Sequence, residues 1–239
     1  MRLTGVILAT IFLAMSLGNE GQAFETDDAS NPIVNKFLTA TKVQQDAFRG
    51  TKMEVDIVAQ LPKLKEQGKL RVLKIIPRLG EITYKRLGEF VGDHTVETEV
   101  IARYLELKTD SSDNASIAIT PENYHFRRKT IMTQGDSRIY IFELKPKKKV
   151  VGLFKGELWL DAATGMPLRE SGTLVKNPSI WLKKVEFVNE FQLKNGVAWP
   201  SHIECHVDVH LAGPADLNVQ FSNVAPAGED DLKEIAEGP

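Results

Sequence analysis

The sequence predicts a mainly β (α+β) fold built on one large antiparallel sheet. From residue 115 onward, apolar and polar residues alternate through most of the chain, which is the period of a strand with one buried face. Turn motifs separate these runs at intervals of about ten residues. Only two stretches, at residues 31–47 and 96–108, have the spacing of amphipathic helices. This pattern is typical of a curved sheet, a sandwich or a barrel with few helices to cover it.

Residues 1–23 have the pattern of a cleaved secretory signal. Arg2 gives a positive start, residues 3–17 are apolar or small, and Gly21 and Ala23 stand where a signal peptidase reads small residues. The apolar run is short for a membrane-spanning helix, although an uncleaved anchor is the alternative. We therefore expect a periplasmic mature chain that starts at Phe24 and has no stable transmembrane segment.

Two helices are expected. In the first, at 31–47, Asn31 can cap the helix and Pro32 suits its first turn. The second, at 96–108, carries apolar residues at steps of four, four and three, which places them on one face. These residues are Val96, Val100, Tyr104 and Leu107.

Strands are expected over most of the remaining chain. Tight turns at Gly135, 161–165 and Asn195-Gly196 favour hairpins. No repeat or second domain is present, so residues 24–224 are expected to form a single domain, followed by an acidic, flexible tail at 225–239. The expected strands are 53–61, 70–76, 81–90, 116–120, 123–132, 137–144, 156–161, 168–175, 183–193, 201–211 and 217–224.

Three of the five histidines lie in HIECHVDVH, at His202, His206 and His210. On a helix they would share one face and could hold a metal ion. Apolar and polar residues alternate strictly here, which predicts a strand with successive histidines roughly 13 Å apart. Metal–nitrogen bonds are about 2 Å long, so no metal site is expected. The alternative is a secreted metalloprotein in which neighbouring strands supply further ligands.

No motif for catalysis or nucleotide binding is present. G-x-S-x-G, G-x-G-x-x-G and the Walker loop are absent, so we expect no catalytic residue and no cofactor. Cys205, the only cysteine, falls on the apolar face of its strand. The balance of 30 basic and 32 acidic residues argues against a nucleic-acid partner. The basic run at 145–149 is expected to be a solvated turn; contact with anionic headgroups is the alternative.

Many predicted strands carry a full apolar face, and only two helices are available to cover them. An incompletely filled interior would bind an acyl chain or a similar apolar ligand; a fully packed core is the alternative. The helix at 96–108 would then be the lid. The side chains expected to line the cavity are Phe142, Leu158, Leu160, Phe187, Phe191, Val207 and Val209.

Three segments carry a family resemblance: FELKPKKK (142–149), GELWLDAATGMPLRESG (156–172) and VEFVNEFQLKNGVAWPSHIE (185–204). With the order of elements, they resemble the LolA-like outer-membrane lipoprotein-sorting proteins. The resemblance implies an unclosed antiparallel β-barrel, with helices as a lid over an apolar cavity. It also implies an arginine that latches the lid, for which Arg71, Arg86 and Arg103 are candidates by position.

The resemblance further implies a function. It is that of a periplasmic carrier or chaperone, not an enzyme, that binds the acyl chains of lipoproteins or lipids and moves them toward the outer membrane. The implied partners are these acyl chains and inner- or outer-membrane proteins. The alternative is an envelope sensor or scaffold of similar fold that binds a protein partner.

Overall fold

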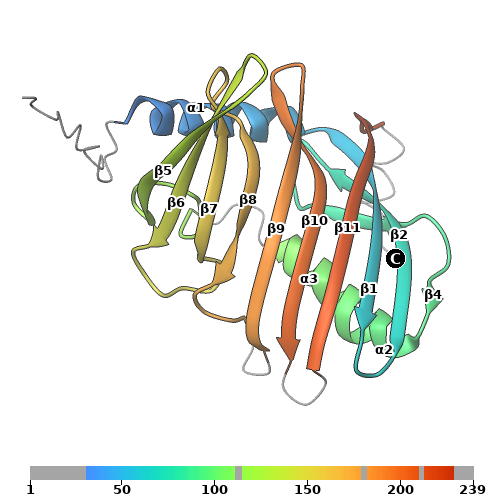
Figure 1. Cartoon of the computed structure of the whole chain (residues 1–239). Helices are drawn as coiled ribbons and strands as arrows, with labels where there is room; N and C mark the ends of the chain where they lie inside the picture. Colours follow the sequence, from blue (N-terminus) through green and yellow to red (C-terminus); the bar gives the residue numbers. More distant parts are fainter. Residues whose placement is uncertain (1–30, 111–114, 179–181, 210–212, 229–239) are drawn as a thin grey trace, which may run out of the picture.

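One antiparallel sheet with helices on a single face makes up the molecule (Figure 1). The structure is a computed structural model and describes residues 31–110, 115–178, 182–209 and 213–228. The predicted signal segment therefore lies outside the described residues. The strands are β1 (Thr51–Leu61), β2 (Glu66–Ile76), β3 (Thr83–Arg86), β4 (Val91–Gly92), β5 (Tyr124–Gln134), β6 (Ser137–Pro146), β7 (Phe154–Asp161), β8 (Pro167–Leu174), β9 (Leu182–Lys194), β10 (Val197–Val209) and β11 (Gly213–Pro226).

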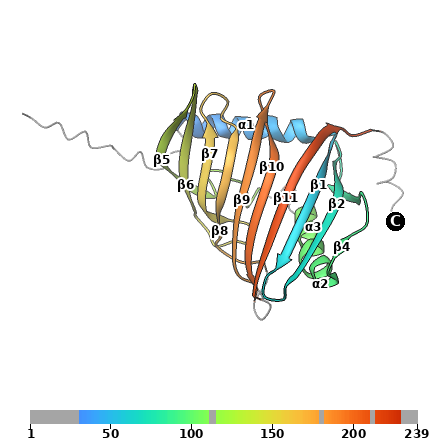
Figure 2. The same cartoon turned by 45° about the vertical axis from the view of Figure 1, so that its right-hand side comes forward.

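The sheet is strongly curved and does not close (Figure 2). Its order is β3-β2-β1-β11-β10-β9-β8-β7-β6-β5, with β4 paired to β2. Every pairing from β5 to β11 joins consecutive strands, as the predicted hairpins require, whereas β1 pairs with β11. The two ends of the sheet, β3 and β5, do not pair with each other within the described ranges. The predicted fold class, an unclosed antiparallel sheet with helices over one face, is confirmed.

The first helix, α1 (Pro32–Phe48), begins as predicted. The Asn31 side-chain oxygen accepts a hydrogen bond from the backbone N–H of Ile33 at 3.2 Å, and Pro32 occupies the first turn. The helix lies across one end of the sheet, where the Lys36 Nζ donates to the carbonyl of Ala162. Its apolar side packs on strands β5–β7, and we call this group the α1 cluster. It consists of Ile33, Val34, Phe37, Tyr124, Phe126, Phe142, Leu144, Leu153, Phe154, Leu158 and Leu160.

The predicted second helix is a continuous helical segment from His94 to Asp110. It consists of α2 (His94–Val96), a π-helical turn η1 (Glu97–Ile101) and α3 (Ala102–Asp110). It covers strands β1, β2 and β11 at the other end of the sheet, and α3 runs on behind β10 (Figure 1). We call this group the α2–α3 cluster, and its buried members are Met53, Val55, Ile57, Ala59, Leu61, Leu70, Val72, Ile76, Val96, Ile101, Ala215, Leu217 and Val219.

The π turn changes which side chains of this segment face the sheet. Val96 and Ile101, five residues apart, are both buried, because a π turn spaces hydrogen-bonded residues by five. The predicted Val100 and Tyr104 are half-buried against the same cluster. The side chain of Leu107 lies outside the described part. A regular helical spacing therefore could not identify Ile101.

Two predicted strands are wrong in whole or in part. Residues 116–120 form turns, because the Asn123 side chain donates to the carbonyls of Ala115 and Ala118 and holds this segment folded back. Within the predicted strand at 81–90, only the residues of β3 pair with β2. The chain pairs with β2 again at the short strand β4. There Gly92 adopts a φ of +134° directly against the backbone of Gln67, so that no side chain fits.

Two glycines face each other across the middle of the sheet. Gly156 on β7 pairs with Gly172 on β8. A Cβ added to Gly156 would overlap the carbonyl oxygen of Ser171, and one added to Gly172 would meet Phe154 and the carbonyl of Lys155. Close approach of this kind is a usual reason for glycine inside a strand.

Candidate ligand-binding site

The candidate site is a half-covered strip on the inward face of the sheet, between the α1 cluster and the α2–α3 cluster. Inward residues of the strands on either side are fully buried, for example Leu158 on β7 and Val219 on β11. Most inward residues of β8–β10 between them are only half-buried, although Val185 and Ala198 are buried. We call this group the inner strip, and it consists of Glu170, Phe187, Asn189, Phe191, Ile203, Cys205 and Val207.

Cross-strand register places these residues on one face, because directly opposed residues in an antiparallel sheet point the same way. One row runs from Leu158 through Glu170, Asn189 and Ile203 to Val219. Its two ends belong to the two helix-covered clusters. The inner strip therefore joins the two clusters and faces the same side as the helices.

The inner strip is mainly apolar and carries aromatic rings. Phe187 packs edge-on against Phe154 of the α1 cluster, with ring centroids 4.9 Å apart. Phe191 packs against Ala198 and Met166 beneath α1. Cys205 and Val207 pack on the opposite side, against the α2–α3 cluster. An apolar ligand on this strip would touch both clusters.

The structure divides the predicted lining residues into two groups. Phe187, Phe191 and Val207 lie on the inner strip. The remaining three described side chains are fully buried in the α1 cluster, so a ligand reaches them only if α1 moves; these are Phe142, Leu158 and Leu160. The side chain of Val209 is outside the described part. Ligand contact by any of these residues stays a prediction.

The inner strip also carries a polar pair that the sequence pattern did not predict. The Asn189 Nδ2 donates to the Glu170 Oε2 at 3.3 Å. Burial, and to a smaller extent the Glu170 carboxylate, raises the pKa of Tyr124 to about 12. The sequence does show a polar residue at an inward position of each of these two predicted strands. Alternation alone, however, cannot distinguish an inward polar residue from a local β-bulge.

The three candidate latch arginines differ in what they join. The Arg86 Nη2 on β3 donates to the Glu97 Oε1 on η1 at 2.8 Å and so links the sheet to the helical segment. Arg71 pairs instead with Asp56 on the neighbouring strand, and Arg103 with Glu99 one helical turn away. Of these three arginines, Arg86 is thus the one whose described ion pair joins the sheet to the helical segment; a latch role for any of them stays a prediction.

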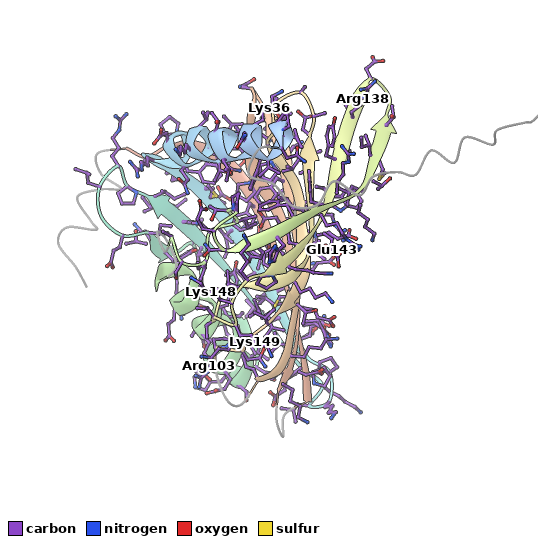
Figure 3. All side chains as sticks on the ribbon, turned by 90° about the vertical axis from the view of Figure 1, so that its left-hand side faces the viewer. Lys36, Arg103, Arg138, Glu143, Lys148 and Lys149 are labelled. Carbon is purple, nitrogen blue, oxygen red and sulfur yellow. The ribbon has the colours of Figure 1, made fainter. Side chains whose placement is uncertain are left out.

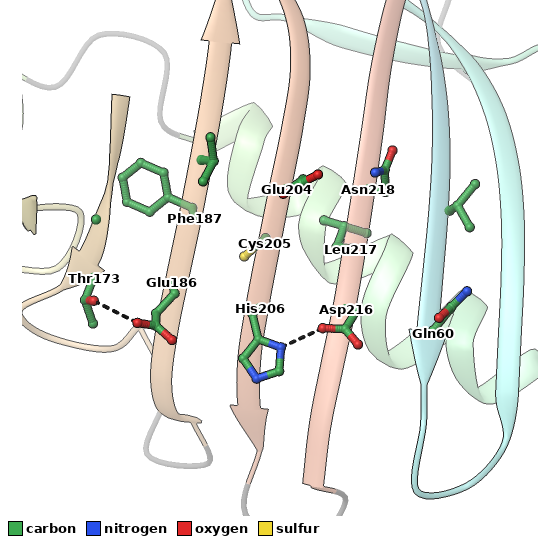
Figure 4. Close-up of a pocket in the computed structure, with 13 residues that line it drawn as sticks. Gln60, Thr173, Glu186, Phe187, Glu204, Cys205, His206, Asp216, Leu217 and Asn218 are labelled. Atoms are coloured by element: carbon green, nitrogen blue, oxygen red, sulfur yellow. Dashed lines mark hydrogen bonds and ion pairs between the residues drawn. The ribbon is translucent and has the colours of Figure 1, made fainter. Parts of the chain in front are cut away.

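The histidines of β10 lie on the outward face, opposite the helices. His206 lies in a shallow groove of about 640 Å³ that crosses β8, β9, β10, β11 and β1 (Figure 4). Its Nδ1 is 2.6 Å from the Asp216 Oδ1, and this hydrogen bond raises the pKa of His206 above its usual range. His202 lies near Glu190 and Glu204 instead, and His210 is outside the described residues. Over the described ranges, no three or more His, Cys, Asp or Glu side chains are placed to hold a metal ion.

The basic run at 145–149 lies where β6 leaves the sheet (Figure 3). The Lys147 Nζ donates to the carbonyl of Pro121 at 2.6 Å, and the Lys145 Nζ is 3.8 Å from Glu143. Lys148 and Lys149 are exposed. The run is thus a solvated connection, as expected.

Comparison with known proteins gives likenesses of structure. No family model and no curated protein matches the chain. Among solved structures, a LolA superfamily protein from Nitrosomonas europaea is 12% identical over 77% of this chain and 92% of its own, with a TM-score of 0.37. A putative outer membrane lipoprotein-sorting protein domain from Vibrio parahaemolyticus is 10% identical over 84% and 96%, with a TM-score of 0.40.

A third solved structure, a DUF1329 family protein from Desulfovibrio piger, is 12% identical over 87% of this chain and 99% of its own, with a TM-score of 0.46. The matches thus include the group that the sequence pattern resembles. At this level of identity they carry no functional residue across. Within the described ranges, no helix has both the length and the apolar content needed to cross a bilayer.

Proposed function

We propose that the protein is a non-catalytic periplasmic carrier that binds the acyl chains of lipoproteins or lipids on the inner strip and moves them toward the outer membrane. One observation carries the proposal. Apolar side chains on the helix-covered face of the sheet are only partly buried between two well-packed clusters. A soluble domain without a ligand would gain stability by burying them.

Acyl-chain burial supplies the energy for such binding. Each methylene removed from water contributes about 0.8 kcal/mol, so ten buried methylenes give roughly 8 kcal/mol before the cost of ordering the chain. This is enough to hold a ligand that must later be released. The Arg86–Glu97 ion pair, at the edge of the sheet, is weak enough to open for entry and exit.

The first test is native mass spectrometry of the mature chain, purified from a periplasmic extract without detergent. We expect a discrete added mass that dissociates as a lipid. A folded protein of bare mass would contradict the proposal and favour the sensor or scaffold alternative.

The second test uses a charge on the inner strip. Phe187→Asp should lower lipid occupancy at least tenfold while export continues, because an acyl chain does not bury a carboxylate. Val188→Asp is the matched control, because Val188 follows Phe187 on β9 and its own side chain points to the outward face. Both variants are checked by circular dichroism. Equal occupancy in the two folded variants would overturn the inner strip as the binding site.

A further inference from the structure

We propose that the end of the sheet away from α1 docks on membranes of anionic phospholipid through a cluster of lysines. The inference rests on the proposed function and adds the place where the carrier meets a membrane. The cluster, which we call the lysine end, surrounds the connections from β6 to β7 and from β8 to β9. Figure 3 shows two of its members, Lys148 and Lys149, away from Lys36 and Arg138 at the other end. The lysine end consists of eight exposed residues: Lys145, Lys147, Lys148, Lys149, Lys155, Lys176, Lys183 and Lys184.

Strand pairing brings the first of these lysines together. Leu144 on β6 pairs with Gly156 on β7. Lys145 and Lys155 lie one residue beyond this pair, so they stand across from each other at the ends of the two strands. Like charges in such positions repel and lower stability.

The β8–β9 connection adds lysines at the same end. The Asn177 Nδ2 donates to the carbonyl of Leu182 at 2.7 Å. This bond closes the connection between Lys176, directly before Asn177, and Lys183, directly after Leu182. The backbone N–H of Val175 also donates to the β6–β7 connection, which holds the two connections against each other.

Only part of this positive charge is neutralised. Lys145 and Lys184 pair with Glu143 and Glu186. Over the part of the chain that the structure describes, no carboxylate lies within ion-pair distance of the other six lysines. The chain as a whole has a net charge of −2. The positive excess at the lysine end is therefore local and does not reflect the composition.

The two further carboxylates next to the lysine end do not cancel this excess. Asp208 pairs across the sheet with Lys184, and Glu122 is close enough to Lys147 for that charge to help lower the pKa of Glu122, after a hydrogen bond from Thr120. Eight lysines thus face these two carboxylates and the two in ion pairs.

The type and place of these cations indicate a membrane. Lysines often protect edge strands from pairing with other chains, but β6–β9 are interior strands. Every cation within residues 145–155 and 174–184 is a lysine. An ammonium on a flexible stem adapts to phosphates in any arrangement, whereas arginine suits fixed, bidentate contacts. The pattern therefore matches a fluid surface of lipid phosphates better than a single shaped ligand.

The inner strip reaches the lysine end. Val207 of the strip pairs with Val185, which directly follows Lys184. The opposite end of the strip lies beneath α1, where Phe191 packs. An acyl chain that leaves the strip along β9, away from α1, therefore emerges among the lysines, next to the docked membrane.

The expected attraction is large enough to measure. Each lysine near an anionic membrane surface tightens binding about fivefold. Salt screens this attraction, because the Debye length falls from about 10 Å at 0.1 M to about 3 Å at 1 M ionic strength. Binding that depends on the lysine end should therefore be lost at high salt.

The experiment measures sedimentation of the mature chain with vesicles of phosphatidylglycerol and phosphatidylcholine in equal parts, and with vesicles of phosphatidylcholine alone. We expect binding only to the anionic vesicles. The double variant Lys148→Gln/Lys149→Gln should bind them at least about tenfold more weakly. Lys42→Gln/Lys194→Gln removes two exposed lysines from the other end; it is the matched control and should bind like wild-type protein.

Two results would overturn the proposal. One is the absence of binding to the anionic vesicles by wild-type protein, and the other is an equal loss of binding in the two double variants, which would show that net charge alone acts. Native mass spectrometry of the same proteins keeps this inference apart from the carrier function, since neither double variant changes the inner strip. Wild-type protein that carries lipid but ignores the vesicles overturns the docking surface and leaves the carrier function standing. Vesicle binding by protein without carried lipid supports the docking surface and overturns the carrier function.

Discussion

At the scale of single residues, His206 has the clearest pH dependence. Its hydrogen bond to Asp216, assisted by the nearby charges of Asp208 and Glu186, raises the pKa of His206 in the folded state. A raised folded-state pKa contributes stability that is fully present below the unfolded value, about 6.5. That contribution is lost as the pH rises through the folded pKa.

Asp216→Asn should therefore lower the pKa of His206 toward its ordinary value, as followed by an NMR titration of the imidazole ring. Asp56→Asn removes a carboxylate from the same face on β1, away from the groove, and should leave the titration unchanged. An unaltered His206 titration in Asp216→Asn would show that the hydrogen bond to Asp216 does not raise the pKa of His206.

Single positions also show what the sequence could and could not reveal. The Asn31 cap was predictable because cap chemistry is local. Glu170 was not, because its inward direction depends on its register with Leu158 and Asn189. Ile101 was missed for a similar reason, since the π turn that buries it has no clear signature in helical spacing.

At the scale of elements, the close contact of β7 and β8 makes a firm prediction. Gly156→Ala should destabilise the fold by about 1–3 kcal/mol, because the added methyl overlaps the backbone of Ser171 and forces the strands apart. Gly88→Ala is the control, since nothing lies within 4 Å of a Cβ there. The midpoints of urea unfolding are compared for the two variants. Equal midpoints would show that β7 and β8 can move apart without loss of stability.

The helical segment 94–110 makes a second prediction at this scale. Arg86→Ala removes its ion pair with Glu97 and should change the free energy of unfolding by less than about 1 kcal/mol, because the pair is exposed. Hydrogen exchange over residues 94–106 should nevertheless become faster. Arg103→Ala breaks a pair within the segment and should not release it from the sheet. The same exchange in both variants would remove Arg86 as a candidate for the latch.

At the scale of the whole molecule, the predictable part of the fold was its local part. The hairpins from β5 to β11 follow from alternation and turn chemistry, so consecutive strands pair as expected. The placement of β1 beside β11 and the separation of the core into distinct clusters depend on contacts between distant segments. The inner strip exists because of that separation, so its lining could be only partly anticipated from apolar positions.

The pairing of β1 with β11 also determines when the protein can become native. This ladder sets Thr51 opposite Pro226, so β1, β2 and the helical segment over them cannot reach their native packing until β11, the last strand of the described residues, has been synthesised. Contacts so distant in sequence make folding slow, and the apolar faces of β1 and β2 stay exposed during that delay. Such surfaces aggregate readily in partly folded chains. We therefore expect a chain truncated just before residue 213 to give an insoluble product.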